Sequence, residues 1–159
     1  MNKNNSNIQN NLYKISKIVH DAHDLNILFK NLHKIITELF EVKNFYIALL
    51  NKDLDLLTYP YYHDIKDQAP KEKFLEGKGL THYTIKKGKG MIFNKDDYQK
   101  LADKNIIQIL GTTPYSWMGV PLKDYNQSTI GLIVIQSYRK EIIFNDDDLK
   151  MMSFISEQL

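Results

Sequence analysis

The residues that could carry chemistry are few, because the chain contains no cysteine. This absence excludes thiolate catalysis, disulfide bonds and cysteine-based zinc sites within the chain. Candidates for iron or haem ligation are therefore the five histidines: His20, His23, His33, His63 and His82. His20 and His23 lie three residues apart on an expected helix, but no third ligand is near them in the sequence. We expect solvated helix histidines there, and His82 is the better candidate for a ligand or a hydrogen bond in a pocket.

A glycine-flanked lysine is the first candidate for binding a small molecule. Gly77, Lys78 and Gly79 directly precede an expected helix over residues 80–87. Glycines before a helix N-terminus can present backbone N–H groups to a carboxylate or phosphate. The alternative is a flexible turn beside a solvated basic rim, to which Lys86, Lys87 and Lys89 would belong.

Aromatic residues form the second candidate group, since small-molecule pockets favour aromatic walls with a few polar groups. The candidates are Tyr46, Tyr59, Tyr61, Tyr83, Trp117 and Tyr138. Strand alternation places Tyr59 and Tyr61 on one face of a sheet and Tyr46 with Ala48 on one face. The alternative is ordinary packing of aromatic residues in an antiparallel sheet.

Motifs for enzymatic catalysis are not visible in the sequence. It contains no nucleophile elbow, no phosphate-binding glycine loop with Lys-Ser/Thr, and no His-Glu-x-x-His. The acidic run Asp146–Asp148 could imitate a metal site. Consecutive helix residues point in different directions, however, so a role in capping a helix is expected instead.

The elements that must position these residues follow from hydrophobic periodicity and capping signals. Helices are predicted over residues 7–21, 26–40, 80–87, 95–103 and 144–159, with Asn94 and Asn145 as caps and Gly88 as a terminator. Strands are predicted over residues 44–51, 54–63, 91–93, 116–123 and 129–138. Pro60 indicates an edge strand or a bulge. Short turns between consecutive strands predict an antiparallel sheet in an α+β fold.

Composition limits the possible partners and locations. The 159 residues have a net charge of +2, with 43% hydrophobic and 25% charged residues, which is typical of one globular domain without a nucleic-acid-binding surface. No apolar run approaches the length of a membrane span, and the polar start over residues 1–11 predicts a disordered lead-in rather than a signal peptide. We expect a cytoplasmic protein.

Four motifs in order resemble those of the GAF domain family. They are GKGLTHYTIKKGKGM (77–91), SWMGVPL (116–122), IGLIVIQSY (130–138) and FNDDDLKMMSFISEQL (144–159). The resemblance covers residues 24–159 and is nearest in wording to GAF modules of bacterial sensor histidine kinases and diguanylate cyclases. It implies a sheet of about six antiparallel strands with the terminal helices on one face and a ligand pocket on the other. Residues 1–23 would form a tail and an amphipathic helix.

The resemblance also excludes or disfavours several known ligands of the family. Covalent bilin attachment at a GAF cysteine and the cysteine chemistry of GAF methionine sulfoxide reductases are excluded here. Cyclic-nucleotide GAF domains carry an Asn-Lys pair where this chain has Ser137 and Tyr138. Phe144 and Asp148 match that family pattern, but Leu149 replaces its glutamate, so cyclic nucleotides are disfavoured and the ligand is left open.

The predicted function is a regulatory small-molecule sensor that signals through its terminal helices to a covalently linked output domain. Any enzymatic activity, such as that of a histidine kinase or diguanylate cyclase, is expected outside this chain. The alternative is a ligand-free dimerisation or spacer module.

The pocket candidates are Tyr46, Tyr59, Tyr61, Leu80, His82, Tyr83, Ser116, Trp117 and Gln136. The candidate interface of a homodimer is Ile8, Leu12, Ile15, Val19, Met152, Ile155 and Leu159, although the stripe over residues 8–19 is equally readable as packing on the domain's own core.

Overall fold

The computed structural model describes residues 2–70, 73–74 and 77–159, and these form an α+β fold around one antiparallel sheet. The sheet has six strands in the order β3-β2-β1-β6-β5-β4. The strands are β1 (Asn44–Asn51), β2 (Leu56–His63), β3 (Lys73–Phe74), β4 (Met91–Asn94), β5 (Ser116–Lys123) and β6 (Thr129–Ser137). The helices are α1 (Asn2–His20), α2 (Leu25–Phe40), α3 (Leu80–Lys87), α4 (Lys95–Asp103) and α5 (Asp146–Glu157). The predicted fold class is confirmed, and β3 is the strand that the sequence did not indicate.

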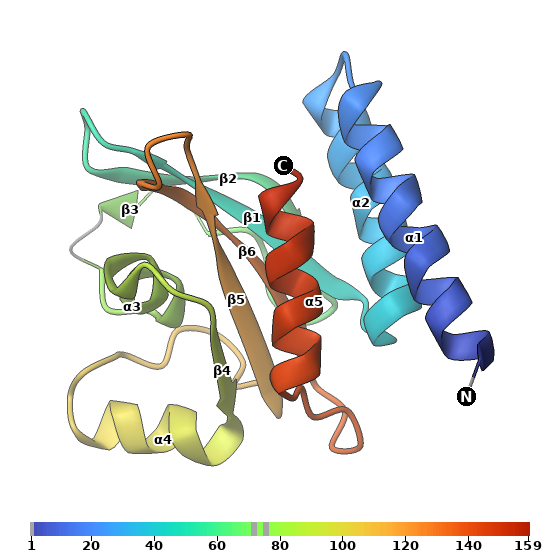
Figure 1. Cartoon of the computed structure of the whole chain (residues 1–159). Helices are drawn as coiled ribbons and strands as arrows, with labels where there is room; N and C mark the ends of the chain where they lie inside the picture. The colour runs from blue at the N-terminus through green and yellow to red at the C-terminus, as the bar shows by residue number, and fades with distance from the viewer. Residues whose placement is uncertain (1, 71–72, 75–76) are drawn as a thin grey trace.

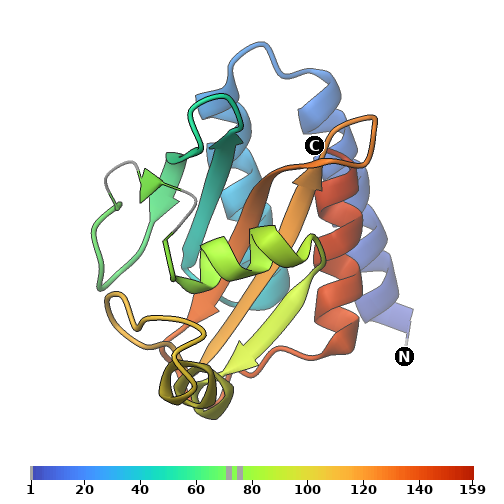
Figure 2. The same ribbon diagram turned by 90° about the vertical axis from the view of Figure 1, so that its left-hand side faces the viewer.

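The helices are divided between the two faces of the sheet. Figure 1 shows the antiparallel pair α1 and α2, together with α5, on one side of the sheet, and α3 and α4 on the other. In the turned view of Figure 2, α3 crosses in front of the strands. Each face has its own apolar core, one under the terminal helices and one under α3. No helix within the described ranges is long and apolar enough to cross a membrane.

Side-chain caps fix where the helices begin. The Asp24 carboxylate accepts hydrogen bonds from the backbone N–H groups of Asn26 (2.7 Å) and Ile27 (3.4 Å) at the start of α2. Asn94 and Asn145 form capping boxes with Asp97 and Asp148. These bonds satisfy N–H groups that have no partner within the helix, which typically contributes about 1 kcal/mol per cap. The role predicted for the acidic run at the start of α5 is therefore confirmed for Asp148.

Helix α1 packs on the domain's own core, which corrects two expectations. It begins at Asn2, so the predicted disordered lead-in is wrong from that residue onward. Ile15 is buried in the core, and Leu12 and Val19 pack against that core. Ser16 donates a hydrogen bond to Gln158 beyond α5. Of the two interpretations of this stripe, the structure supports packing within the domain.

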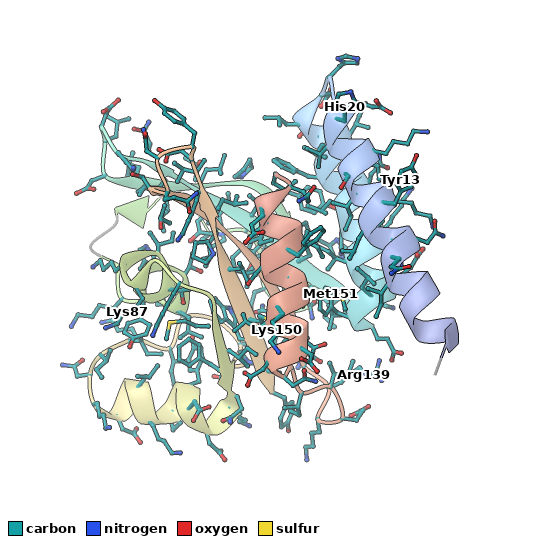
Figure 3. The ribbon with its side chains drawn as sticks, in the orientation of Figure 1. Tyr13, His20, Lys87, Arg139, Lys150 and Met151 are labelled. Atoms are coloured by element: carbon teal, nitrogen blue, oxygen red, sulfur yellow. The ribbon has the colours of Figure 1, made fainter. Side chains whose placement is uncertain are left out.

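Two of the candidate interface residues, both on α5, are also buried in the core of the domain. Met152 and Ile155 are fully buried against the sheet and cannot contact a second copy, so their assignment to a dimer interface is wrong, as is that of Ile15. Ile8 is half-buried, and Leu159 keeps 40% of its surface exposed. Figure 3 shows Met151 on the side of α5 toward α1 and α2, whereas Tyr13 projects outward from α1.

A β-bulge in β2 changes which tyrosines share a face. Ile47 of β1 pairs with Tyr61, but Leu49 pairs with Thr58, so two residues of β2, Tyr59 and Pro60, lie opposite one residue of β1. The bulge predicted from Pro60 is confirmed. It inverts the alternation, because an extra residue in a strand turns later side chains to the other face. Tyr61 therefore lies in the helix-side core, while Tyr59 lies in the α3-side core, and the prediction that they share a face is wrong.

Gly131 in β6 allows the close approach of β1. A Cβ atom at this position would lie 2.5 Å from the backbone oxygen of Ala48 and 2.9 Å from Leu49 Cδ2. Substitution would push apart the central pair of strands.

We expect Gly131→Ala to lower the free energy of unfolding by roughly 1–3 kcal/mol, because the strands must separate to admit the methyl group. Gly90→Ala is the matched control, since the closest neighbour of its Cβ would be the flexible end of Leu149 at 3.0 Å and no backbone atom is among its three nearest neighbours. Urea unfolding followed by circular dichroism measures both. Equal stability of the two variants would contradict this account.

His33 links α2 to the sheet and should make stability depend on pH. Its Nε2 donates to the Lys43 carbonyl (2.9 Å), and the Tyr61 hydroxyl donates to Nδ1 (2.8 Å), as the neutral tautomer requires. Burial lowers the pKa of His33, the Lys43 hydrogen bond opposes this, and His63 adds to the lowering. A lowered pKa contributes stability above about pH 6.5 that is lost as the pH falls through the folded-state value.

We therefore expect the difference in unfolding free energy between about pH 7.5 and about pH 5 to be smaller in His33→Gln than in the unmodified chain. His23→Gln, at an exposed position in the turn between α1 and α2, is the control for replacing a histidine by glutamine as such. An unchanged slope in His33→Gln would remove this histidine from the pH response.

Candidate functional site

A cavity of about 250 Å³ lies between the sheet and the α3 side of the molecule. The strands contribute Tyr46 from β1, Tyr59 and Tyr62 from β2, Trp117 from β5 and Gln136 from β6. The first turn of α3 contributes Leu80, Thr81 and His82. The connecting segments and α4 complete the lining with Asp67, Gln68, Pro70, Gly79, Tyr98, Leu110, Gly111, Thr112 and Pro114. The site thus draws on residues from position 46 to position 136.

Three tyrosines form one wall of the cavity. Tyr46 and Tyr62 are cross-strand partners, and their rings stack with centroids 5.1 Å apart. Tyr59 meets Tyr62 edge-on at 6.1 Å and lies at the same distance from Tyr46. The bulge at Pro60 makes this cluster possible, because it turns both Tyr59 and Tyr62 toward the cavity.

Trp117 continues the aromatic lining onto β5. A Cβ at Gly119 would lie 2.3 Å from the Trp117 ring, so the indole lies along its own strand over the position that has no side chain. Its Nε1 donates to the Tyr46 hydroxyl (3.4 Å), which also shares a hydrogen bond with Thr81 (2.9 Å). These bonds join β5, β1 and α3 at the floor of the cavity.

Two carboxylates, Asp64 and Asp67, lie in the segment that follows β2. Asp64 accepts hydrogen bonds from Gln136 Nε2 (2.6 Å) and from the Tyr138 hydroxyl (3.1 Å). Asp67 accepts from the backbone N–H of Thr112 (2.8 Å) and from its hydroxyl (2.9 Å). Only Asp67 of the two lines the cavity. Among the described residues neither carboxylate forms a salt bridge.

The surrounding tyrosines remain protonated and neutral. Burial raises the pKa of Tyr59 to about 12 and also raises the pKa of Tyr46. The pKa values of Tyr62 and Tyr138 are raised first by burial and then by the negative charges of Asp64 and Asp67. These hydroxyls can donate or accept hydrogen bonds, but they add no charge to the site at neutral pH.

Six of the nine predicted pocket residues line this cavity: Tyr46, Tyr59, Leu80, His82, Trp117 and Gln136. The other three do not. Tyr61 lies in the helix-side core with His33 because of the bulge. Tyr83 is on α3 but packs against Phe93 and under Lys87, away from the cavity. Ser116 is buried on the helix side of β5, where its hydroxyl accepts a hydrogen bond from the backbone N–H of Phe144.

The residues missed by the sequence analysis come mainly from connecting segments. Asp67 and Thr112 are 45 positions apart, and no local pattern indicates that they meet. Tyr62 was missed because the bulge reverses its face. Tyr98 could have been found from the apolar stripe of α4, since it is the buried residue of that helix.

The glycines before α3 have a steric explanation. A Cβ at Gly77 would lie 2.5 Å from His82 Nε2, and one at Gly79 would lie 3.3 Å from His82 Nδ1. The missing side chains thus make room for the buried His82 ring. No lysine is found among the described residues that line the cavity. The described part of the chain also contains no cluster of His, Asp or Glu residues suited to a metal ion.

A family model for the GAF domain matches residues 22–159. The chain belongs to the GAF domain family. Two solved GAF domains have the same fold at low identity. That of a phosphoenolpyruvate-protein phosphotransferase from Coxiella burnetii has a TM-score of 0.76 at 12% identity, covering 95% of this chain and 89% of that one. The Nlh2 GAF domain of A. aeolicus, in an inactive state, has a TM-score of 0.67 at 17% identity, covering 98% and 94%. A search of curated protein sequences gives no match.

A third similar structure corrects the expectation that any enzymatic activity lies outside this chain. The free methionine-R-sulfoxide reductase from Neisseria meningitidis, in complex with its substrate, has a TM-score of 0.76 at 18% identity, covering 95% of this chain and 84% of that one. A GAF fold of this kind can therefore be an enzyme on its own, and the expectation that this chain is a regulatory domain without enzymatic activity of its own is wrong. Since the chain lacks cysteine, a reaction at this site would use groups other than a thiol.

We expect Tyr46→Phe to lower the free energy of unfolding by about 1–2 kcal/mol, because Trp117 Nε1 and the Thr81 hydroxyl lose a buried partner. Tyr125→Phe is the control, since Tyr125 is 93% exposed. Chemical denaturation measures both variants. If Tyr46→Phe were as stable as the control, the hydrogen bonds at the cavity floor would make no measurable contribution to the free energy of unfolding.

Proposed function

We propose that this GAF domain is a regulatory sensor for a small molecule, which binds in the cavity between the sheet and α3. The observation that carries the proposal is the cavity itself, with its aromatic wall and a few polar groups from Asp67, Thr81 and Gln136. Ligand sites commonly combine such walls with a small number of orienting polar groups. The volume of about 250 Å³ lies just below the range of drug-sized ligands, so the ligand is compact.

Strand β5 supplies a route from the cavity to the terminal helices. In β5, Trp117 lines the cavity, and the next residue, Met118, lies in the core under the helices. Ser116 binds the backbone N–H of Phe144, just before α5. Beyond α5, Gln158 accepts the hydrogen bond from Ser16 of α1. A ligand that shifts β5 would therefore act on both terminal helices, and through them on a covalently linked output domain of a bacterial cytoplasmic signalling protein.

A ligand-free dimerisation or spacer module is the second candidate. It is favoured by large apolar side chains exposed on the helical layer. These are Tyr13 on α1, Leu25 and Ile27 on α2, and Phe154 on α5. A homodimer in either role would use these outer residues rather than the buried stripe of α1.

The function is tested by screening nucleotides, amino acids, amines and small acids for thermal stabilisation and for a change in tryptophan fluorescence. Trp117 is the only tryptophan and lines the cavity, so its emission reports occupancy there. We expect at least one compound to raise the melting temperature in a concentration-dependent way and to shift this emission. Stabilisation without a change at Trp117 would place binding elsewhere. Absence of both effects, with a dimer in light scattering, would favour the spacer.

For the same hit compound, we expect amide hydrogen exchange in α5 to slow on binding in the unmodified chain, since order gained in β5 reaches the helix through Phe144. Ser116→Ala should reduce this protection while the hit still changes Trp117 emission. Ser128→Ala, on the β5–β6 turn, is the control and should leave the protection intact. Full protection of α5 in Ser116→Ala would show that the signal takes another route.

A further inference from the structure

The charge of the cavity indicates what kind of molecule it accepts. Asp67 is the only Asp or Glu among the described lining residues, and neither lysine nor arginine lines the cavity there. Asp64 adds a second negative charge close behind, because the Tyr138 hydroxyl contacts both carboxylates, at 3.1 Å from Asp64 and 3.4 Å from Asp67. The Lys66 ammonium lies over the ring of the same Tyr138, 4.9 Å from its centroid, and Lys66 does not line the cavity.

The hydrogen bonds of Asp64 and Asp67 indicate that the two carboxylates have different roles. Asp64 accepts from the backbone N–H groups of Lys66 and Asp67, and from Gln136 and Tyr138, so its oxygens are well supplied with donors. It fixes the course of the segment after β2. Asp67 is held by the two bonds from Thr112, which orient it without neutralising its charge. Its carboxylate lines the cavity with no lysine or arginine beside it among the described lining residues.

The aromatic wall also favours a positively charged ligand. Tyr46, Tyr59 and Tyr62 have ring centroids within 5.1–6.1 Å of one another, and Trp117 bonds to the first of them. The faces of aromatic rings attract cations, and clusters of such rings are used to recognise quaternary ammonium groups. An anion would meet Asp67 and the ring faces without a lysine or arginine to balance its charge among the described lining residues.

We propose, resting on the sensor function above, that the ligand is a compact organic cation, whose ammonium or quaternary ammonium group lies near Asp67 and whose hydrocarbon surface contacts the tyrosine wall. The carboxylate supplies long-range attraction, and the rings supply contact area. The volume of about 250 Å³ favours a compact cation over a nucleotide-sized one.

The test compares probes of equal shape and different charge on the unmodified chain. Choline, its neutral carbon isostere 3,3-dimethylbutan-1-ol, and the anion 3,3-dimethylbutanoate are titrated while Trp117 emission and heat of binding are recorded. A second pair, butylammonium and butan-1-ol, covers primary amines. We expect at least one cation to bind about tenfold or more tightly than its neutral partner, with added salt weakening the cation alone.

Asp67→Asn should weaken binding of that cation by about tenfold while leaving the neutral isostere unchanged. Asp55→Asn is the control, because it removes the same charge at an exposed turn where Asp55 has a φ of 54°, a conformation that asparagine tolerates. The comparison of probes needs no variant, so it stands even if Asp67→Asn fails to fold.

The outcomes separate this inference from the sensor function. Neutral or anionic probes that bind as tightly as the cations, or cation binding that survives Asp67→Asn unchanged, would overturn the charge preference and leave the sensor function intact. The charge preference is also overturned if no cation changes Trp117 emission while another compound of the broad screen does. A broad screen without any hit would contradict both the charge preference and the sensor function.

Discussion

Most of this structure depends on the two-sidedness of its central strands. Residues of β1, β6 and β5 alternate between a core under the terminal helices and a cavity under α3. In β6, Ile133 and Ile135 face the helices, whereas Val134 and Gln136 face the cavity side. A shift of register by one residue would exchange the two sets. The close contact at Gly131 resists such a shift. Within β2, the bulge at Pro60 introduces a shift of one residue, and this shift turns Tyr62 toward the cavity.

The cavity side is closed by connections rather than by sheet hydrogen bonds. Asp64 and Asp67 hold the segment after β2 against β6 and against the segment that precedes β5. At Gly111, where φ is +73°, a Cβ would lie 2.7 Å from Asp67 Oδ2, so the backbone wraps closely around this carboxylate. The same group thus closes the cavity and gives it its charge. This double role explains why one aspartate matters to both shape and selectivity.

Local signals in the sequence were enough to predict most of the elements, but not β3, the first residues of α1 or all of the site. Caps at Asn94 and Asn145 and the stop at Gly88 depend on neighbours a few residues away, and the helices begin and end where those signals indicate. Tyr46 and Trp117 were predicted as aromatic residues of the strands, and the structure places them with Gln136 on the cavity face. Tyr61 was misplaced because a bulge breaks the alternation of β2, and its effect on later residues cannot be read from Pro60 alone. Asp67 was missed because its partner, Thr112, is distant in the sequence.

The cost of the cavity bears on the choice between a sensor and a spacer. A fully enclosed dry void of about 250 Å³ would cost roughly 6 kcal/mol, a large part of the stability of an ordinary domain, but this cavity is only partly enclosed. Polar groups such as Asp67, Thr81 and Gln136 allow water to enter and reduce that cost. A cavity filled by apolar side chains would avoid this cost, but Thr81 and Gln136 also serve as the hydrogen-bond partners of Tyr46 and Asp64. A spacer gains nothing from keeping a charged group beside such a space, whereas a sensor needs both the space and the charge to distinguish its ligand.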